Sequence, residues 1–248
     1  LAFWCRFAER GYTIAIVEYR PSSLAIFPAQ VQDAKTAVRW LRARAETYSI
    51  DPDRIVMAGD SSGGHTALMV HATQHFDEFD DEPGQPLDLR AVIDFYAPTD
   101  LARLNDEPST MDHTAADSPE GRLLGGISPL AAPELVAHAN PSSWISPDRP
   151  LVPLLVIHGS KDRLIPFAQS VYHVEALRAA GQPVELVQVR DADHGIWPAM
   201  FNDRVADIVD DFIRRHTSPV AAGVEASAIL AMADARPPTV VTGPLAGR

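Results

Sequence analysis

The sequence predicts an α/β fold, in which a mostly parallel sheet carries helices on both faces. Strand-like segments alternate with helix-like segments along most of the chain, and this order is typical of such a sheet. The strand-like segments are almost continuously apolar, as strands covered on both faces are. A length of 248 residues fits one domain with one core.

The first part of the chain supplies one helix, one strand and a second helix. Residues 3–10 are predicted to end a helix, because Gly11 follows at the position where a left-handed residue commonly stops helices. Residues 12–19 (YTIAIVEY) are predicted as a buried strand from their apolar and β-branched content. Residues 28–47 are predicted as a helix with one buried stripe, because apolar residues recur at helical spacing, at Val31, Ala34, Val38 and Leu41.

The same alternation continues through the rest of the chain. Short apolar runs predict strands, and longer periodic runs predict helices. In order, these are a strand at 54–58, a helix at 64–74, strands at 89–96 and 152–157, a helix at 167–180, a strand at 184–189 and a helix at 198–216.

Three segments lack a regular pattern. Residues 76–86 are acidic and rich in turn residues, which predicts a solvated loop rather than a metal site, because no spaced set of ligands is present. Residues 100–150 are irregular and rich in Pro, Gly, Ser and Asn, and a loop of that length predicts a partial cover over an active site. We therefore expect one domain over residues 1–217 and a flexible tail at 218–248.

Charge and composition exclude several classes of partner. The net charge of −12 argues against nucleic acid and anionic membranes, and it fits a small neutral substrate. No apolar run is long enough to span a bilayer. The single cysteine, Cys5, excludes an intrachain disulfide and a cysteine-based metal site, and it is predicted as a small buried hydrophobe.

Residues 59–64 (GDSSGG) lie between a predicted strand and a predicted helix, which is the context of a nucleophile elbow, a sharp turn that raises a serine above the edge of a sheet. The residues two before and two after such a serine pack closely and have to be glycine. For Ser61 both are glycine, whereas for Ser62 the earlier one is the bulky Asp60. Ser61 is therefore the predicted nucleophile, and the N-terminus of the next helix favours negative charge beside it.

A serine nucleophile needs a general base, and imidazole suits that role near neutral pH. His194 follows the last predicted strand, at a loop that opens on the same edge as the elbow, and it is the predicted base. His65, on the helix after the serine, is expected to have a supporting or structural role. His158, at the end of a buried strand, is expected to be a core or hinge residue.

The base needs a carboxylate that fixes its tautomer. Asp162 follows the strand at 152–157, at the carboxyl edge where such sheets place their sites, and it is the predicted acid. Asp191 and Asp193 are alternatives, but they stand so close to His194 in sequence that they are expected to shape its loop instead.

These motifs resemble the esterase and lipase branch of the α/β-hydrolases, in which the serine, acid and histidine follow one another in this order. The resemblance rests on GDSSGGHTA, HGSKDRLIP and DADHG. More narrowly, FPAQVQDAKTAVRWLRARAETYSIDPDRI, AVIDFYAPTDL, SPEGRLLGG and NPSSWIS are similar to bacterial feruloyl-esterase-like and acetyl-xylan-esterase-like carboxylesterases, over about residues 1–216. The resemblance implies no cofactor and no metal, and it implies that the backbone amide of Ser62 helps to hold the oxyanion.

The resemblance also implies a His-Gly-Gly-Gly-type loop, with the strand that leads into it, before residues 12–20. Neither is present in this sequence. We therefore expect the natural gene product to be longer and this chain to be impaired, since losing one oxyanion donor costs about 10² to 10³ in turnover.

The predicted activity is hydrolysis of a small-molecule ester with a short acyl chain, for example acetylated or feruloylated carbohydrate, through an acyl-enzyme. Tyr96, Trp144 and Trp197 are candidates for the substrate pocket, although aromatic residues are common in cores. Two alternatives are open: a formamidase or amidase of the same fold, and a non-catalytic protein on a hydrolase scaffold.

Overall fold

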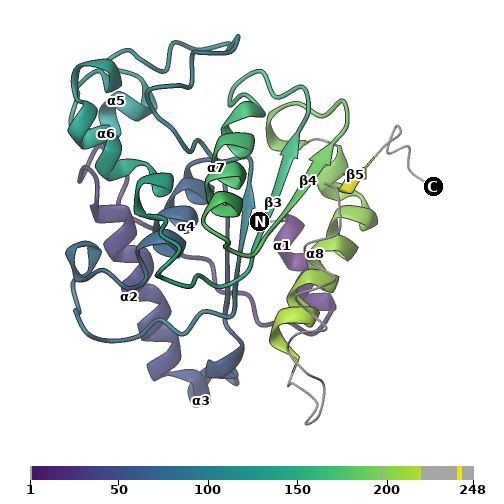
Figure 1. Cartoon of the computed structure of the whole chain (residues 1–248). Coiled ribbons are helices and arrows are strands. Elements are labelled where there is room, and N and C mark those ends of the chain that lie inside the picture. Colours follow the sequence, from purple (N-terminus) through teal and green to yellow (C-terminus); the bar gives the residue numbers. More distant parts are fainter. Residues whose placement is uncertain (1, 197, 219–238, 242–248) are drawn as a thin grey trace.

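A parallel sheet forms the centre of the molecule. The computed structural model describes residues 2–196, 198–218 and 239–241. In these residues, five strands pair side by side in chain order (Figure 1), and every pairing is parallel. The strands are β1 (Val56–Asp60), β2 (Ala91–Phe95), β3 (Leu154–Gly159), β4 (Val184–Val189) and β5 (Thr239–Val241).

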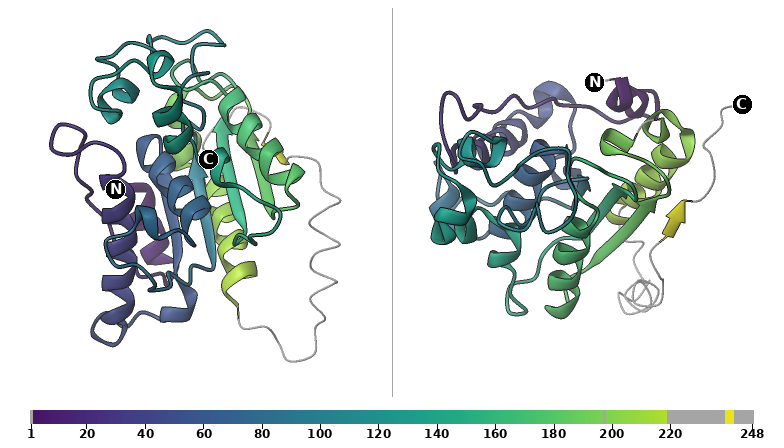
Figure 2. Two further views of the ribbon diagram at one scale, coloured as in Figure 1. Left: turned by 60° about the vertical axis from the view of Figure 1, so that its left-hand side comes forward. Right: turned by 90° about the horizontal axis from the view of Figure 1, so that it is seen from above.

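Helices cover both faces of the sheet, as Figure 2 shows from two further sides. One face carries α1 (Ala2–Glu9) and α8 (Asp203–Thr217), and the other carries α2 (Ala29–Ala43), α4 (Ser62–Thr73) and α7 (Ala168–Ala179). Shorter helices lie outside these layers: α3 (Ala45–Tyr48), α5 (Pro119–Leu123) and α6 (Pro133–Ala139).

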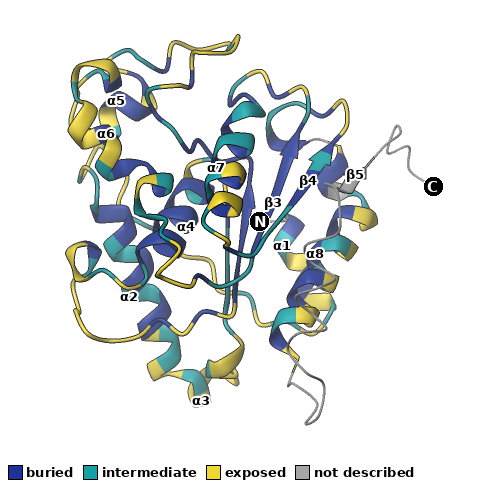
Figure 3. Ribbon diagram, viewed as in Figure 1, coloured by how far each residue is buried: buried dark blue, intermediate teal, exposed yellow. Residues whose placement is uncertain are grey.

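The two-residue period of the strands divides the core between the two faces. In β2, Ile93 and Phe95 pack with α1 and α8, whereas Val92 packs with α2, α4 and α7. All five residues of β2 and all six of β3 are buried, as the dark blue centre of Figure 3 shows. The apolar runs at 89–96 and 152–157 therefore form inner strands of the sheet, as predicted.

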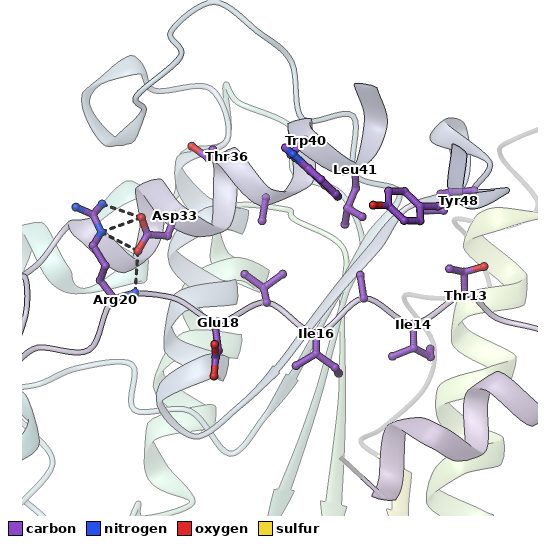
Figure 4. A pocket seen from close by; sticks show the side chains of 14 residues that line it. Thr13, Ile14, Ile16, Glu18, Arg20, Asp33, Thr36, Trp40, Leu41 and Tyr48 are labelled. Atoms are coloured by element: carbon purple, nitrogen blue, oxygen red, sulfur yellow. Dashed lines mark hydrogen bonds and ion pairs between the residues drawn. The ribbon is translucent and has the colours of Figure 1, made fainter. Parts of the chain in front are cut away.

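The predicted strand at 12–19 is wrong. In the part of the chain that the structure describes, residues 13–19 pair with no strand, and no backbone hydrogen bond joins them to β1. Instead the segment runs extended between two cavities. One, of about 700 Å³, lies against α2, where Trp40 and Leu41 line it and Arg20 pairs with Asp33 at its end (Figure 4). The other, of about 550 Å³, separates the segment from β1.

The physical reason is that a strand needs a partner for its backbone groups. No neighbouring strand fills the space between this segment and β1 in the described residues, so residues 13–19 keep an extended course without a ladder. Ile16, a core residue by prediction, is consequently 57% exposed.

The prediction for Cys5 is wrong, and that for the loop at 76–86 is incomplete, because most of the loop is exposed but part of it is buried. Cys5 is exposed, because α1 turns Phe3 and Phe7 toward the core and the residue midway between them faces outward. The loop at 76–86 is not simply solvated. Phe79 is fully buried, and the buried carboxylate of Asp80 forms an ion pair with Arg39.

Residues 100–150 are more ordered than predicted. They contain α5 and α6, and they enclose an apolar cluster of their own with Leu101, Leu104 and Val136 at its centre. Their role as a cover stays a prediction. Of the predicted tail, residues 219–238 and 242–248 lie outside the described residues, and residues 239–241 form β5 against β4.

Buried histidines make the fold sensitive to acid, because burial lowers the pKa of His65, His71 and His173. Burial lowers the pKa of His71 on α4 to about 4 and that of His173 on α7 to about 3. The unfolded chain binds these protons near pH 6.5, so it takes up more protons than the folded chain as the pH falls below that value. We therefore expect the free energy of unfolding to decrease between about pH 6.5 and pH 4, approaching about 1.4 kcal/mol per pH unit for each histidine.

Urea unfolding followed by circular dichroism between about pH 7 and pH 4.5 measures this dependence. His173→Gln removes one of these groups, so its curve should be shallower. His113 opposes the trend: despite its burial, Glu120 raises its pKa, so it gains protons on folding. Equal slopes for the wild type and the variant would contradict the prediction.

Candidate active site

The predicted nucleophile sits in a strained turn between β1 and α4. Ser61 has a φ of 52° and a ψ of −118°, a conformation that residues other than glycine rarely adopt. Its backbone amide donates to the carbonyl oxygen of Phe95 at 2.9 Å, which ties the turn to the end of β2. The serine hydroxyl is thereby held at the carboxyl edge of the sheet, at the start of a helix.

Close backbone packing explains two of the glycines around Ser61. A Cβ atom on Gly59 would lie 2.1 Å from the carbonyl oxygen of Gly63, and one on Gly64 would lie 2.5 Å from Oδ1 of Asp94. At Gly63 the nearest atom would be the hydroxyl oxygen of Tyr19, at 3.9 Å. The predicted clash two residues after the serine is therefore wrong, and the close approach falls one residue later.

His194 lies between the serine and the acid. Its Nε2 is 3.1 Å from Oγ of Ser61, and its Nδ1 is 2.8 Å from Oδ2 of Asp162. Because the carboxylate can only accept, Nδ1 carries the proton and Nε2 is free to accept from the serine hydroxyl. The loops that carry acid and base pack backbone to backbone, since a Cβ atom on Gly159 would lie 2.4 Å from the carbonyl oxygen of Ala192.

Asp162 is buried and held by several donors. Its Oδ1 accepts the backbone amides of Leu164 and Ile165 at 2.9 and 2.8 Å, and Oδ2 accepts from His194. Burial alone would raise the pKa of Asp162, but hydrogen bonds from His158 and His194 hold it well below the usual range. The carboxylate is therefore charged beside the base near neutral pH.

The rival carboxylates do not reach the imidazole of His194. Asp193 accepts from the backbone amide of His194 and pairs with Arg163, and Asp191 pairs with Lys161. Both shape the loop, as the sequence predicts.

His158 has a role that the sequence did not indicate. It is buried at the end of β3, and its Nε2 lies 3.2 Å from Oδ2 of Asp162. The prediction of a satisfied core residue holds for its burial, but it missed this contact with the acid. The spacing of four residues between His158 and Asp162 was the available signal, and it is informative only once the loop after β3 is known to turn back.

Of the predicted oxyanion and pocket residues, Ser62 and Tyr96 lie beside the triad, whereas Trp144 does not. Ser62 is the first residue of α4, so its amide has no partner within the helix. Tyr96 packs its ring against His194, with 4.9 Å between ring centroids, but is only 3% exposed. Trp144 packs on Phe76, beyond the other end of α4, and is not part of this group. Trp197 lies outside the described residues.

The described residues contain no group of three or more His, Cys, Asp or Glu side chains that could hold a metal ion. Among them, no helix combines the length and apolar character needed to cross a membrane.

Comparison with known proteins gives consistent matches. A family model described as BD-FAE matches residues 2–177. LipM of Mycobacterium tuberculosis, described as a probable carboxylic ester hydrolase, is 31% identical over 191 residues, which cover 75% of this chain and 42% of LipM. The chain therefore spans less than half the length of this curated relative.

Solved structures of esterases have a similar fold. A truncated form of a carbohydrate esterase from gut microbiota superposes with a TM-score of 0.73 at 29% identity, covering 82% of this chain and 73% of that one. An acetyl ester-xyloside bifunctional hydrolase from Caldicellulosiruptor lactoaceticus superposes with a TM-score of 0.61 at 26% identity, covering 79% and 68%.

Proposed function

This chain belongs to the BD-FAE family and has the α/β-hydrolase fold, and from that premise we propose that it is a serine carboxylesterase. The observation that carries the proposal is the unbroken line of hydrogen bonds from Ser61 through His194 to Asp162. Three loops from different strands supply these residues, so their alignment is a property of the fold rather than of one local motif.

The proposed reaction is acyl transfer in two steps. Ser61 attacks the ester carbonyl while His194 takes its proton, and Asp162 stabilises the imidazolium that forms. The amide of Ser62, at the N-terminus of α4, donates to the oxyanion. His194 then protonates the leaving alcohol, and it activates the water that hydrolyses the acyl-enzyme.

We propose short-chain acyl esters as the substrate class, with acetylated or feruloylated carbohydrate as the natural context. Support comes from the two structural neighbours, one described as a carbohydrate esterase and the other as an acetyl ester-xyloside bifunctional hydrolase. The negative net charge agrees with a neutral substrate.

Labelling with a fluorophosphonate tests the proposed mechanism. We expect one covalent label per chain, mapped by mass spectrometry to the peptide that contains Ser61, because a base-activated serine attacks phosphorus as it attacks an ester carbonyl. Labelled and unlabelled protein should then be compared in hydrolysis of p-nitrophenyl acetate and of an N-formyl arylamide.

The outcomes separate the alternatives. Loss of acetate hydrolysis on labelling supports the esterase. A chain that hydrolyses only the formyl amide would be a formamidase. A folded chain that takes no label would be a non-catalytic member of the fold, and the proposal would be wrong.

A further inference from the structure

The carboxylate of the proposed triad binds a second imidazole. Oδ2 of Asp162 lies 2.8 Å from Nδ1 of His194 and 3.2 Å from Nε2 of His158. Oδ1 is occupied by two backbone amides. The side chain of Asp162 is 0% exposed, so solvent does not contact the charged carboxylate. The negative charge is therefore divided among four donors and is not directed to His194 alone.

The surroundings of His158 fix which nitrogen carries its proton. Nε2 faces two acceptors, Oδ2 of Asp162 and the carbonyl oxygen of Ile165 at 2.9 Å, so it must be protonated. Nδ1 lies 2.7 Å from Oγ of Ser170, a buried hydroxyl in the first turn of α7. Among the described residues that hydroxyl has no other partner, so it is free to donate to Nδ1 when Nε2 carries the proton.

We propose that His158 is a positioning residue of this site, a proposal that rests on the proposed function. His158 orients Asp162 toward His194 and takes up part of the carboxylate's charge. One consequence follows from the geometry. The carboxylate cannot rotate away from His194 without losing its contact with His158.

Three substitutions separate this role from simple packing. His158→Leu keeps an apolar volume but removes the donor. His158→Gln keeps an N–H donor at the same number of bonds from Cα as Nε2 and carries no titratable group. His173→Leu is the matched control, because His173 is also a buried histidine, it bonds to Ser142, and it has no hydrogen bond to the triad.

Steady-state hydrolysis of p-nitrophenyl acetate is the first readout. In His158→Leu we expect kcat to fall about 10- to 100-fold with KM nearly unchanged, which is the range that corresponds to loss of one polar contact to a charged group. His158→Gln should restore most of kcat, and His173→Leu should keep the wild-type kcat and KM.

Proton NMR of hydrogen-bonded imidazole N–H groups is the second readout, and it does not depend on activity. Two of the downfield signals of the wild type should come from the two imidazoles at Asp162, and His158→Gln should lose one of these two and keep the other. If His158→Leu is recovered unfolded, His158→Asn replaces it, because its amide is one bond too short to reach Asp162.

The outcomes that overturn the proposal are specific. A folded His158→Leu variant with the wild-type kcat would do so, as would equal losses of kcat in the Gln and Leu variants, which would indicate packing alone. A set of downfield signals that His158→Gln leaves unchanged would remove the contact on which the proposal depends. Failure of the proposed function is distinguishable, because the wild type would then lack Ser61-dependent hydrolysis while both NMR signals persist.

Discussion

Ser61→Ala is expected to lower kcat for p-nitrophenyl acetate by roughly 10³- to 10⁴-fold, which is the drop of about 10⁶ in a complete site reduced by the factor of about 10² to 10³ that a lacking oxyanion donor costs. The hydroxyl of Ser61 is the atom that accepts the acyl group in the proposed mechanism, and no other hydroxyl in the described residues contacts Nε2 of His194. Its neighbour Ser62 cannot replace it, because the Ser62 hydroxyl bonds to Tyr19. Initial rates at saturating substrate measure the effect.

Controls make this result interpretable. The strained backbone at Ser61 is retained by alanine, so circular dichroism and urea unfolding should resemble those of the wild type. Ser218→Ala is a matched substitution at the end of α8, where the hydroxyl binds the carbonyl oxygen of Arg214, and it should keep the wild-type rate. Retention of more than a small fraction of activity in Ser61→Ala would mean that another group is the nucleophile.

Local sequence signals predicted the sheet and the elbow well, because each depends on residues close together in the chain. The runs at β2 and β3 are almost continuously apolar, so burial on both faces of the sheet was the prediction that they favoured, and every residue of both strands is buried. The glycines around Ser61 indicate a turn, and all the residues that form this turn lie within six positions of the sequence.

Features that depend on distant segments could not be predicted in the same way. Residues 12–19 have the composition of a strand, but a strand exists only where a partner lies beside it, and residue composition does not report the partner. The sequence around Asp80 is typical of an exposed loop, and the ion pair that Asp80 forms with Arg39 involves a residue far away in sequence. The contact of His158 with Asp162 likewise depends on how the loop after β3 closes.

Asp162→Asn is expected to lower kcat by about 10⁴-fold, with little change in KM. All partners of Asp162 are donors: two backbone amides at Oδ1, and His158 and His194 at Oδ2. An asparagine has one oxygen, so its NH₂ group must face one of these pairs. If the oxygen stays on the backbone amides, the NH₂ group donates to Nδ1 of His194. The imidazole then carries its proton on Nε2, which faces Ser61 and can no longer accept from it.

Kinetics of Asp162→Asn beside Asp191→Asn measure this effect, because Asp191 is an exposed carboxylate in the loop before His194 that pairs with Lys161 and does not touch the imidazole. The control should keep kcat within about threefold, since an exposed ion pair contributes little. Fluorophosphonate labelling should slow in Asp162→Asn in proportion to kcat, because the same proton transfer activates the serine in both reactions. If Asp162→Asn instead keeps kcat within tenfold of the wild type, the carboxylate does not select the tautomer of the base, and the assignment of Asp162 as the acid of the triad would be wrong.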